Sequence, residues 1–95
     1  MSARRIDRVQ LARLLDIEES FIIELEEHEI VVQDAEGRFD VYAVERVRVC
    51  WTMRQSLGVN TPGLEVALDL LDRWQSERRR VHTLLVALKR ERDQR

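Results

Sequence analysis

The 95-residue sequence contains few of the residues that interrupt helices or cross-link small folds: three glycines, one proline and one cysteine. A single cysteine excludes an internal disulfide and is typical of a reducing compartment, so we expect a cytoplasmic protein. The sequence has no apolar run long enough to cross a bilayer. Its N-terminal residues lead into an amphipathic segment without the apolar core of a signal peptide. No membrane association is therefore expected.

Charged residues, in contrast, are abundant. They make up 36% of the chain, and with so little glycine and proline this composition favours helices over a sheet. The length predicts a single small domain, of a size that often gains stability by oligomerising. The net charge of -2 conceals an uneven distribution: residues 16–40 carry ten acids and one base, whereas residues 73–95 carry eight bases and three acids. This asymmetry indicates one acidic and one basic surface.

Two short helices joined by a tight turn are predicted at the N-terminal end. Asp7 is a good N-cap for a helix over residues 8–15. Asp16 can adopt the left-handed backbone conformation that a tight turn requires. A second helix is predicted over residues 18–28, because Phe21, Ile22 and Leu25 recur at helical spacing.

A small β-hairpin wing is predicted after the second helix. Residues 29–33 are rich in β-branched side chains and are expected to form a strand. Residues 34–37 are expected to turn, with Gly37 supplying a positive φ, and residues 38–39 would form the returning strand. We assign residues 1–60, which hold the first three predicted helices and the wing, to one head. Phe21, Phe39 and Tyr42 are expected to complete its hydrophobic core.

Two further helices complete the predicted fold, which is all-α apart from the wing. Asp40 can cap a helix over residues 41–57, and Gly58 suits its C-terminal end. Thr61 as N-cap, followed by Pro62, predicts the start of a last helix that extends to about residue 92. A bend near residues 75–77 is possible, because apolar residues are scarce there.

The last helix carries a coiled-coil pattern, with alternating four- and three-residue spacings over Ala67, Leu71, Trp74, Arg78, Val81, Leu85 and Leu88. We expect residues 61–95 to pack on the head, to form a homodimer, or both. The expected dimer seam consists of Leu71, Trp74, Val81, Leu85 and Leu88. A helical hairpin folded back within one chain would use the same residues, and it stays open as an alternative.

The order of these elements resembles the winged helix-turn-helix head of MerR-type proteins. Within residues 57–71, Leu57, Gly58, Val59 and Asn60 are followed by Gly63 and an aliphatic helix, and this stretch is similar to the CbpM-type chaperone modulators. The resemblance covers almost the whole chain. It implies an inhibitor that binds the J-domain of a CbpA/DnaJ-like co-chaperone and restrains its cooperation with DnaK.

The second helix differs in sequence from the corresponding helix of the DNA-binding MerR-type proteins. Where they typically present an arginine and adjacent tyrosines, this sequence has Ile23, Glu24 and Leu25, and their usual glycine after the helix is Glu29. DNA affinity depends on cations placed against phosphates, and carboxylates in that position repel them. The sequence therefore favours a basic protein partner over nucleic acid.

The candidate partner-binding residues are Glu18, Glu19, Glu24, Glu27, Arg54 and Asn60, of which the four glutamates follow from this charge. Two alternatives stay open. The glutamates can form merely a solvated helix face. The partner can instead dock on the third helix and the start of the fourth, where Arg46, Arg54 and Asn60 lie; Asn60 also suits a turn.

The alternative function is a MerR-type DNA-binding transcriptional regulator with redistributed contacts. The phosphate contacts would then come from Arg4, Arg5, Arg8, Arg13 and Arg38. The basic residues 78–80 and 89–92 offer a second nucleic-acid or membrane-surface candidate. We favour their interaction with the helix dipole, or with the acidic head of a second subunit, because no aromatic residue is interleaved with them.

No enzyme, cofactor or metal site is predicted. His28 and His82 lack metal-ligand spacing, and Cys50 falls on the apolar stripe of its helix, where a core role is expected. The serines fall in no nucleophile motif, and no glycine-rich phosphate loop is present.

Overall fold

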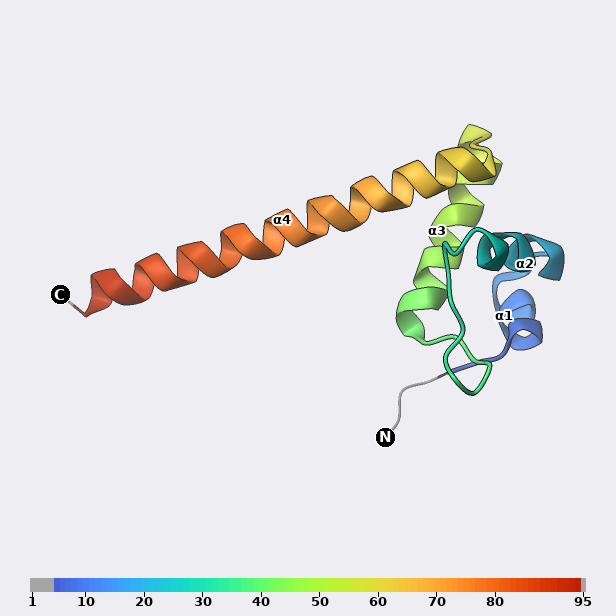
Figure 1. Ribbon diagram of the computed structural model, residues 1–95, viewed down its shortest axis with the longest axis horizontal. Coiled ribbons are helices and arrows are strands. Elements are labelled where there is room, and N and C mark those ends of the chain that lie inside the picture. The colour runs from blue at the N-terminus through green and yellow to red at the C-terminus, as the bar shows by residue number, and fades with distance from the viewer. Residues whose placement is uncertain (1–4, 95) are drawn as a thin grey trace.

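The computed structural model describes residues 5–94, so the candidate phosphate contact Arg4 lies outside the described residues. This part of the chain folds into four helices: α1 (Arg8–Leu15), α2 (Glu19–Glu27), α3 (Val41–Leu57) and α4 (Thr61–Asp93). The first three form a head, from which α4 projects as one long helix (Figure 1). The molecule therefore extends 58 Å along its longest axis but only 20 Å along its shortest.

The α1–α2 pair forms as the sequence predicts. Asp7 caps α1 in a reciprocal arrangement, in which its carboxylate accepts the Gln10 N–H at 2.8 Å and the Gln10 side chain accepts the Asp7 N–H at 2.9 Å. Asp16 ends α1 in the left-handed region, with φ of 56°. Glu29 also has positive φ, 58°, so a glutamate occupies a backbone conformation that glycine adopts more readily.

The predicted β-hairpin wing is wrong. Residues 28–38 form turns and irregular loop, and the one β-bridge within residues 5–94 pairs Ile6 with Phe39. A strand directs successive side chains to opposite faces, yet both Ile30 and Val31 are buried in the core. The β-branched run therefore serves as core packing, and the Ile30 N–H donates to the Leu25 carbonyl at the end of α2.

A tight loop replaces the tip of the wing. The Asp34 carboxylate accepts the backbone N–H groups of Glu36 at 2.9 Å and Arg38 at 3.0 Å, and it pairs with Arg5 at 2.9 Å. The hydrogen bond from the Arg38 N–H, helped by those from Glu36 and Arg5, lowers the pKa of Asp34. Gly37 has φ of 77°, as the predicted turn requires.

The hydrophobic core lies between the three helices of the head and the first turns of α4. Its largest fully buried side chains are Phe39, Leu11, Ile22, Leu25, Leu64, Leu68, Val47 and Cys50. Phe21 packs edge-on against Trp51, with ring centroids 5.1 Å apart. The core position of Cys50 is confirmed, but the prediction for Tyr42 is wrong, because this ring is exposed and its hydroxyl donates to Asp72 at 3.2 Å.

α4 begins one residue earlier than predicted. The N-cap is Asn60, whose side chain accepts the Gly63 N–H at 2.9 Å, whereas Thr61 is the first helical residue. The Thr61 hydroxyl donates to the Glu24 carboxylate instead of capping the helix. The predicted cap at Thr61 is therefore wrong by one position.

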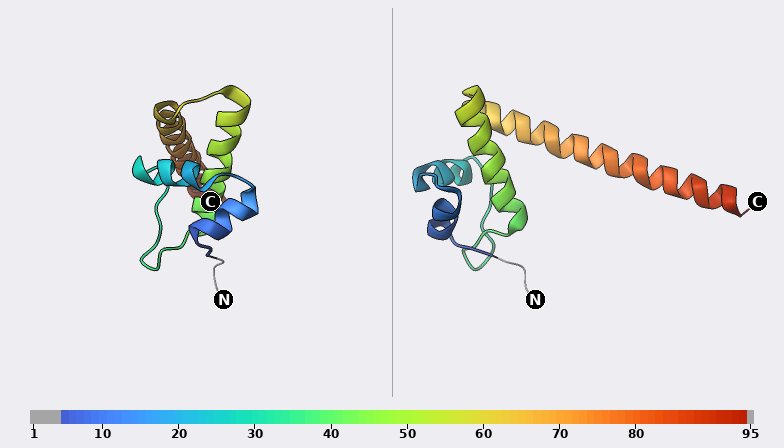
Figure 2. Two further views of the ribbon diagram at one scale, coloured as in Figure 1. Left: turned by 90° about the vertical axis from the view of Figure 1, so that its right-hand side faces the viewer. Right: turned by 180° about the vertical axis from the view of Figure 1, so that it is seen from behind.

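Beyond its first turns, α4 leaves the head entirely. The helix continues without interruption to Asp93, so neither the bend near residues 75–77 nor the helical hairpin is formed within this range (Figure 2). Thr61, Leu64 and Leu68 are its buried residues, and every residue from Arg73 to Gln94 is exposed. No helix within residues 5–94 has the combination of length and apolar character needed to cross a membrane.

Candidate protein-interaction surface

The outward side of α2 combines carboxylates with one apolar side chain. Because Phe21, Ile22 and Leu25 are buried beneath it, the helix turns Glu19, Ile23 and Glu27 to solvent at four-residue spacing. Glu18, at the helix N-cap, is also exposed. We call Glu18, Glu19, Ile23 and Glu27 the acidic face.

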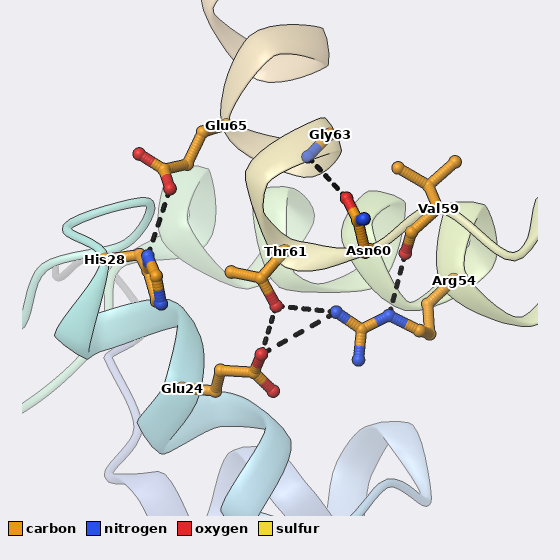
Figure 3. Close-up of polar contacts among 8 residues, drawn as sticks. All are labelled: Glu24, His28, Arg54, Val59, Asn60, Thr61, Gly63 and Glu65. Atoms are coloured by element: carbon orange, nitrogen blue, oxygen red, sulfur yellow. Dashed lines mark hydrogen bonds and ion pairs between the residues drawn. The ribbon is translucent and has the colours of Figure 1, made fainter.

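Glu24, the next predicted partner contact, points the other way. Its carboxylate accepts the Thr61 hydroxyl and lies 3.8 Å from the Arg54 guanidinium (Figure 3). Arg54 in turn donates to the Val59 carbonyl at 2.8 Å and to the Thr61 hydroxyl at 2.7 Å, and it stacks over Phe21 at 5.2 Å. The structure thus brings Glu24 and Arg54 together as an internal contact. Their role toward a partner stays a prediction.

A second contact joins the same two helices. His28 Nδ1 lies 3.0 Å from a Glu65 carboxylate oxygen, one turn beyond the Glu24–Thr61 contact on both helices (Figure 3). We call Glu24, His28, Arg54, Thr61 and Glu65 the α2–α4 joint. No contact between His28 and Glu65 was predicted from the sequence. The matching four-residue spacings, Glu24 to His28 and Thr61 to Glu65, were the available signal.

A shallow cleft opens beside this joint. It has a volume of about 480 Å³ and is lined by Glu24, His28, Arg54 and residues 58–62. Asn60 is one of the lining residues, and its side chain caps α4. The cleft brings Asn60 close to Glu24 and Arg54, whereas Glu18, Glu19 and Glu27 are not among its lining residues.

The joint yields a stability prediction. Arg54→Ala is expected to lower the free energy of unfolding by about 2 kcal/mol, because it removes two hydrogen bonds, leaves the Glu24 carboxylate without its cation and exposes Phe21. Urea unfolding followed by tryptophan fluorescence measures the change. Arg48→Ala is the matched control: Arg48 pairs with Glu45 on an exposed surface, so we expect less than about 0.5 kcal/mol.

Two candidate phosphate contacts are already bound to carboxylates. Arg5 pairs with Asp34 at 2.9 Å and with Glu36 at 3.1 Å. Arg8 forms two hydrogen bonds with Glu26, at 2.8 and 3.3 Å, and this contact raises the pKa of Arg8 above its ordinary value. Both guanidinium groups therefore have carboxylate partners within the fold. Arg13 and Arg38 are exposed.

The projecting part of α4 presents large apolar side chains to solvent. Of the five predicted seam residues, Leu71 is half-buried, and the exposed fractions of Trp74, Val81, Leu85 and Leu88 are 54%, 53%, 61% and 62%. Arg78 covers one side of the Trp74 ring at 4.8 Å. Large apolar side chains grouped on an exposed surface are typical of interaction sites, and the role of these residues as a dimer seam stays a prediction.

The remaining chemical candidates are metal-ligating side chains and the Cys50 thiol. Across residues 5–94, no group of three or more histidine, cysteine, aspartate or glutamate side chains is placed to hold a metal ion. Burial raises the pKa of the Cys50 thiol to about 11, so it is a poor nucleophile at neutral pH.

Comparisons with known proteins agree with this architecture. The family described as MerR HTH family regulatory protein matches residues 6–85. Chaperone modulatory proteins CbpM of two Coxiella burnetii strains, Dugway 5J108-111 and RSA 331 / Henzerling II, are each 28% identical over 79 residues, which cover 79% of this chain and 74% of the relative. No solved structure matches. The chain therefore belongs to the MerR helix-turn-helix family of regulatory proteins, in which it is similar to the CbpM-type chaperone modulators.

Proposed function

We propose that this protein is a chaperone-modulatory adaptor that binds the J-domain of a CbpA/DnaJ-like co-chaperone and inhibits its cooperation with DnaK. The observation that carries the proposal is the acidic face of α2, the helix that, by the resemblance, DNA-binding MerR-type proteins typically present to DNA. The similarity to CbpM supports the same assignment. Such a protein would act in the cytoplasm, beside its co-chaperone.

The chemistry of the acidic face suits a basic protein surface. Glu19 and Glu27 flank Ile23, so a partner can form an apolar contact with carboxylates on both sides. Charges at the rim of an interface steer the partner and increase the association rate. The resemblance implies a J-domain as the partner. The second helix of J-domains is typically basic and forms the surface that meets DnaK. An acidic helix on that surface would therefore exclude DnaK by competition.

Charge reversal on the acidic face tests this proposal. Glu19→Lys combined with Glu27→Lys is expected to weaken J-domain binding at least about tenfold, because two attractive contacts become repulsive. Titration calorimetry with the isolated J-domain measures the affinity. Glu36→Lys is the matched control, since it makes the same change on the loop at residues 34–38 and is expected to leave the affinity unchanged.

Three outcomes would contradict parts of the proposal. Unchanged affinity of the double variant would exclude the acidic face as the binding surface. No J-domain binding by the wild-type chain would exclude the function itself. Tight, sequence-selective binding to a DNA duplex, with a steep dependence on salt, would instead favour the DNA-binding regulator.

We further propose that the protein is a homodimer, joined through Leu71, Trp74, Val81, Leu85 and Leu88 of two antiparallel α4 helices. The charges of α4 support this direction, because residues 61–77 carry four acids and one base, whereas residues 78–93 carry six bases and two acids. Antiparallel pairing brings opposite charges together, and parallel pairing brings like charges together. The two-fold axis would then lie near Glu77 and Arg78. In this arrangement the head binds the partner and residues 61–95 assemble the dimer.

A further inference from the structure

A groove separates the segment at residues 30–32 from the first turn of α3. The segment runs without a helical turn from the end of α2 to the loop at residues 34–38 (Figure 1). The groove has a volume of about 310 Å³, and its lining includes Val31, Val32, Asp40, Tyr42 and Ala43. In the predicted hairpin this segment would have paired with a returning strand, but Phe39 pairs with Ile6 instead.

The backbone beside this groove has hydrogen-bonding groups without partners. In the described part of the chain, neither the N–H nor the C=O group of Val31 or Val32 bonds to another protein group. Val31 is only 3% exposed, whereas buried backbone groups in folded proteins nearly always have a partner. Extended segments with free N–H and C=O groups are templates to which a further strand is added. The segment therefore has the properties of an exposed strand edge.

The side chains of the groove also suit an extended peptide. Val32 on one wall is 71% exposed and Tyr42 on the other is 58% exposed, so both walls offer apolar surface. Arg46 on α3 donates to the Ile30 carbonyl at 3.0 Å and to the Asp72 carboxylate on α4 at 2.9 Å. Because these contacts join the segment to both helices, the groove is formed before anything binds, and a ligand needs little rearrangement.

We propose that this groove binds an extended segment of another protein, which pairs with residues 31–33 as an added strand and carries at least one cationic side chain. Strand addition obtains its affinity from main-chain hydrogen bonds and its specificity from alternate side chains. This surface is separate from the acidic face of α2, because no residue of that face lines the groove.

The charge of the groove favours a cationic segment. Asp40 and Asp72 both line it, and the guanidinium of Arg46, the one arginine among the lining residues, is already bound to Asp72. The negative charge of Asp40 is therefore not balanced within the groove. A lysine or arginine at one end of the bound segment would complement it.

A synthetic peptide of alternating valine and lysine, blocked at both ends, tests the proposal. The isotope-labelled full chain is titrated with it and observed by amide NMR. We expect saturable shifts at residues 31–33 and 40–43. Amide hydrogen exchange is expected to slow at least about tenfold at one of the two valines, because alternate residues of a strand face the added partner and the new hydrogen bond protects that N–H. No saturable shift would overturn the proposal.

A second peptide separates strand pairing from attraction of charge. It has the same side chains but is N-methylated at every residue, so it keeps the charge and apolar surface and cannot donate main-chain hydrogen bonds. We expect it to bind at least about tenfold more weakly, because several hydrogen bonds are lost. Equal affinities of the two peptides would overturn strand addition.

Two variants of the protein locate the site. Val32→Lys adds a cation to the wall of the groove and is expected to weaken binding of the unmethylated peptide at least about tenfold. Leu14→Lys is the matched control, because Leu14 is 66% exposed on α1 and does not line the groove, so we expect its affinity to stay within about twofold. Equal affinities of the two variants, or shifts confined to the acidic face of α2, would overturn the assignment to the groove.

Discussion

Phe39→Ala is expected to lower the free energy of unfolding by about 3–5 kcal/mol. Phe39 is fully buried and is the largest of the side chains that are completely enclosed. Its backbone also pairs with Ile6, with N–O distances of 2.7 and 3.1 Å, so it joins the N-terminal segment to the loop before α3. Truncation to alanine would remove these packing contacts and leave a cavity that a small core cannot easily refill.

The expected loss is a large share of the stability of a small domain, which is typically about 5–15 kcal/mol. Urea unfolding at a fixed protein concentration measures it, because dimerisation would make the midpoint depend on concentration. Val32→Ala is the matched control: Val32 lies in the same loop but is 71% exposed, so we expect a change within about 0.5 kcal/mol. Equal effects of the two substitutions would mean that Phe39 lies on an exposed wing after all.

Leu85→Lys is expected to convert the proposed dimer into a monomer and to weaken self-association at least about 100-fold, or roughly 2.7 kcal/mol. Leu85 is a seam residue, 61% exposed in the single chain. The substitution would remove an apolar contact and bury a charge twice in a symmetric dimer. Sedimentation at two protein concentrations measures the association. The emission of Trp74, another seam residue, is expected to shift to longer wavelength as it returns to water.

Thr83→Lys is the matched control for this change. It adds the same charge to the same helix two residues away, and at helical spacing it falls on the side of α4 opposite Leu85. We therefore expect self-association to be nearly unchanged. If Leu85→Lys forms dimers as readily as Thr83→Lys, the seam is not the interface.

Much of the helical architecture could be predicted because its signals are local. Asp7 and Asp40 cap helices through hydrogen bonds to residues three positions ahead, and Gly58 ends α3 with a left-handed backbone. The predicted bounds of α1 and α3 agree with the structure. Capping and helical periodicity depend on neighbours within one or two turns, so a single sequence is enough to reveal them.

The loop at residues 28–38 could not be predicted correctly, because its backbone conformation depends on contacts with residues that are distant in the sequence. Ile30, Val31 and Val32 have side chains that favour strands. Their backbone conformation is instead determined by the burial of Ile30 and Val31 in the core and by the hydrogen bond from the Ile30 N–H to the end of α2. Phe39 pairs with Ile6, thirty-three positions away, rather than with this run. Tertiary packing therefore overrides the β propensity of the segment.

The sequence by itself determined the helices of this protein, the apolar stripe along α4 and the separation of acidic from basic segments. Only the tertiary structure decided which carboxylates face solvent: Glu19 and Glu27 are exposed, whereas Glu24 meets Thr61 and Arg54, and Glu26 meets Arg8. The physical reason is that ion pairs form between groups brought within a few ångströms of each other. For Glu24 and Arg54, thirty residues apart, that distance exists only once the chain is folded.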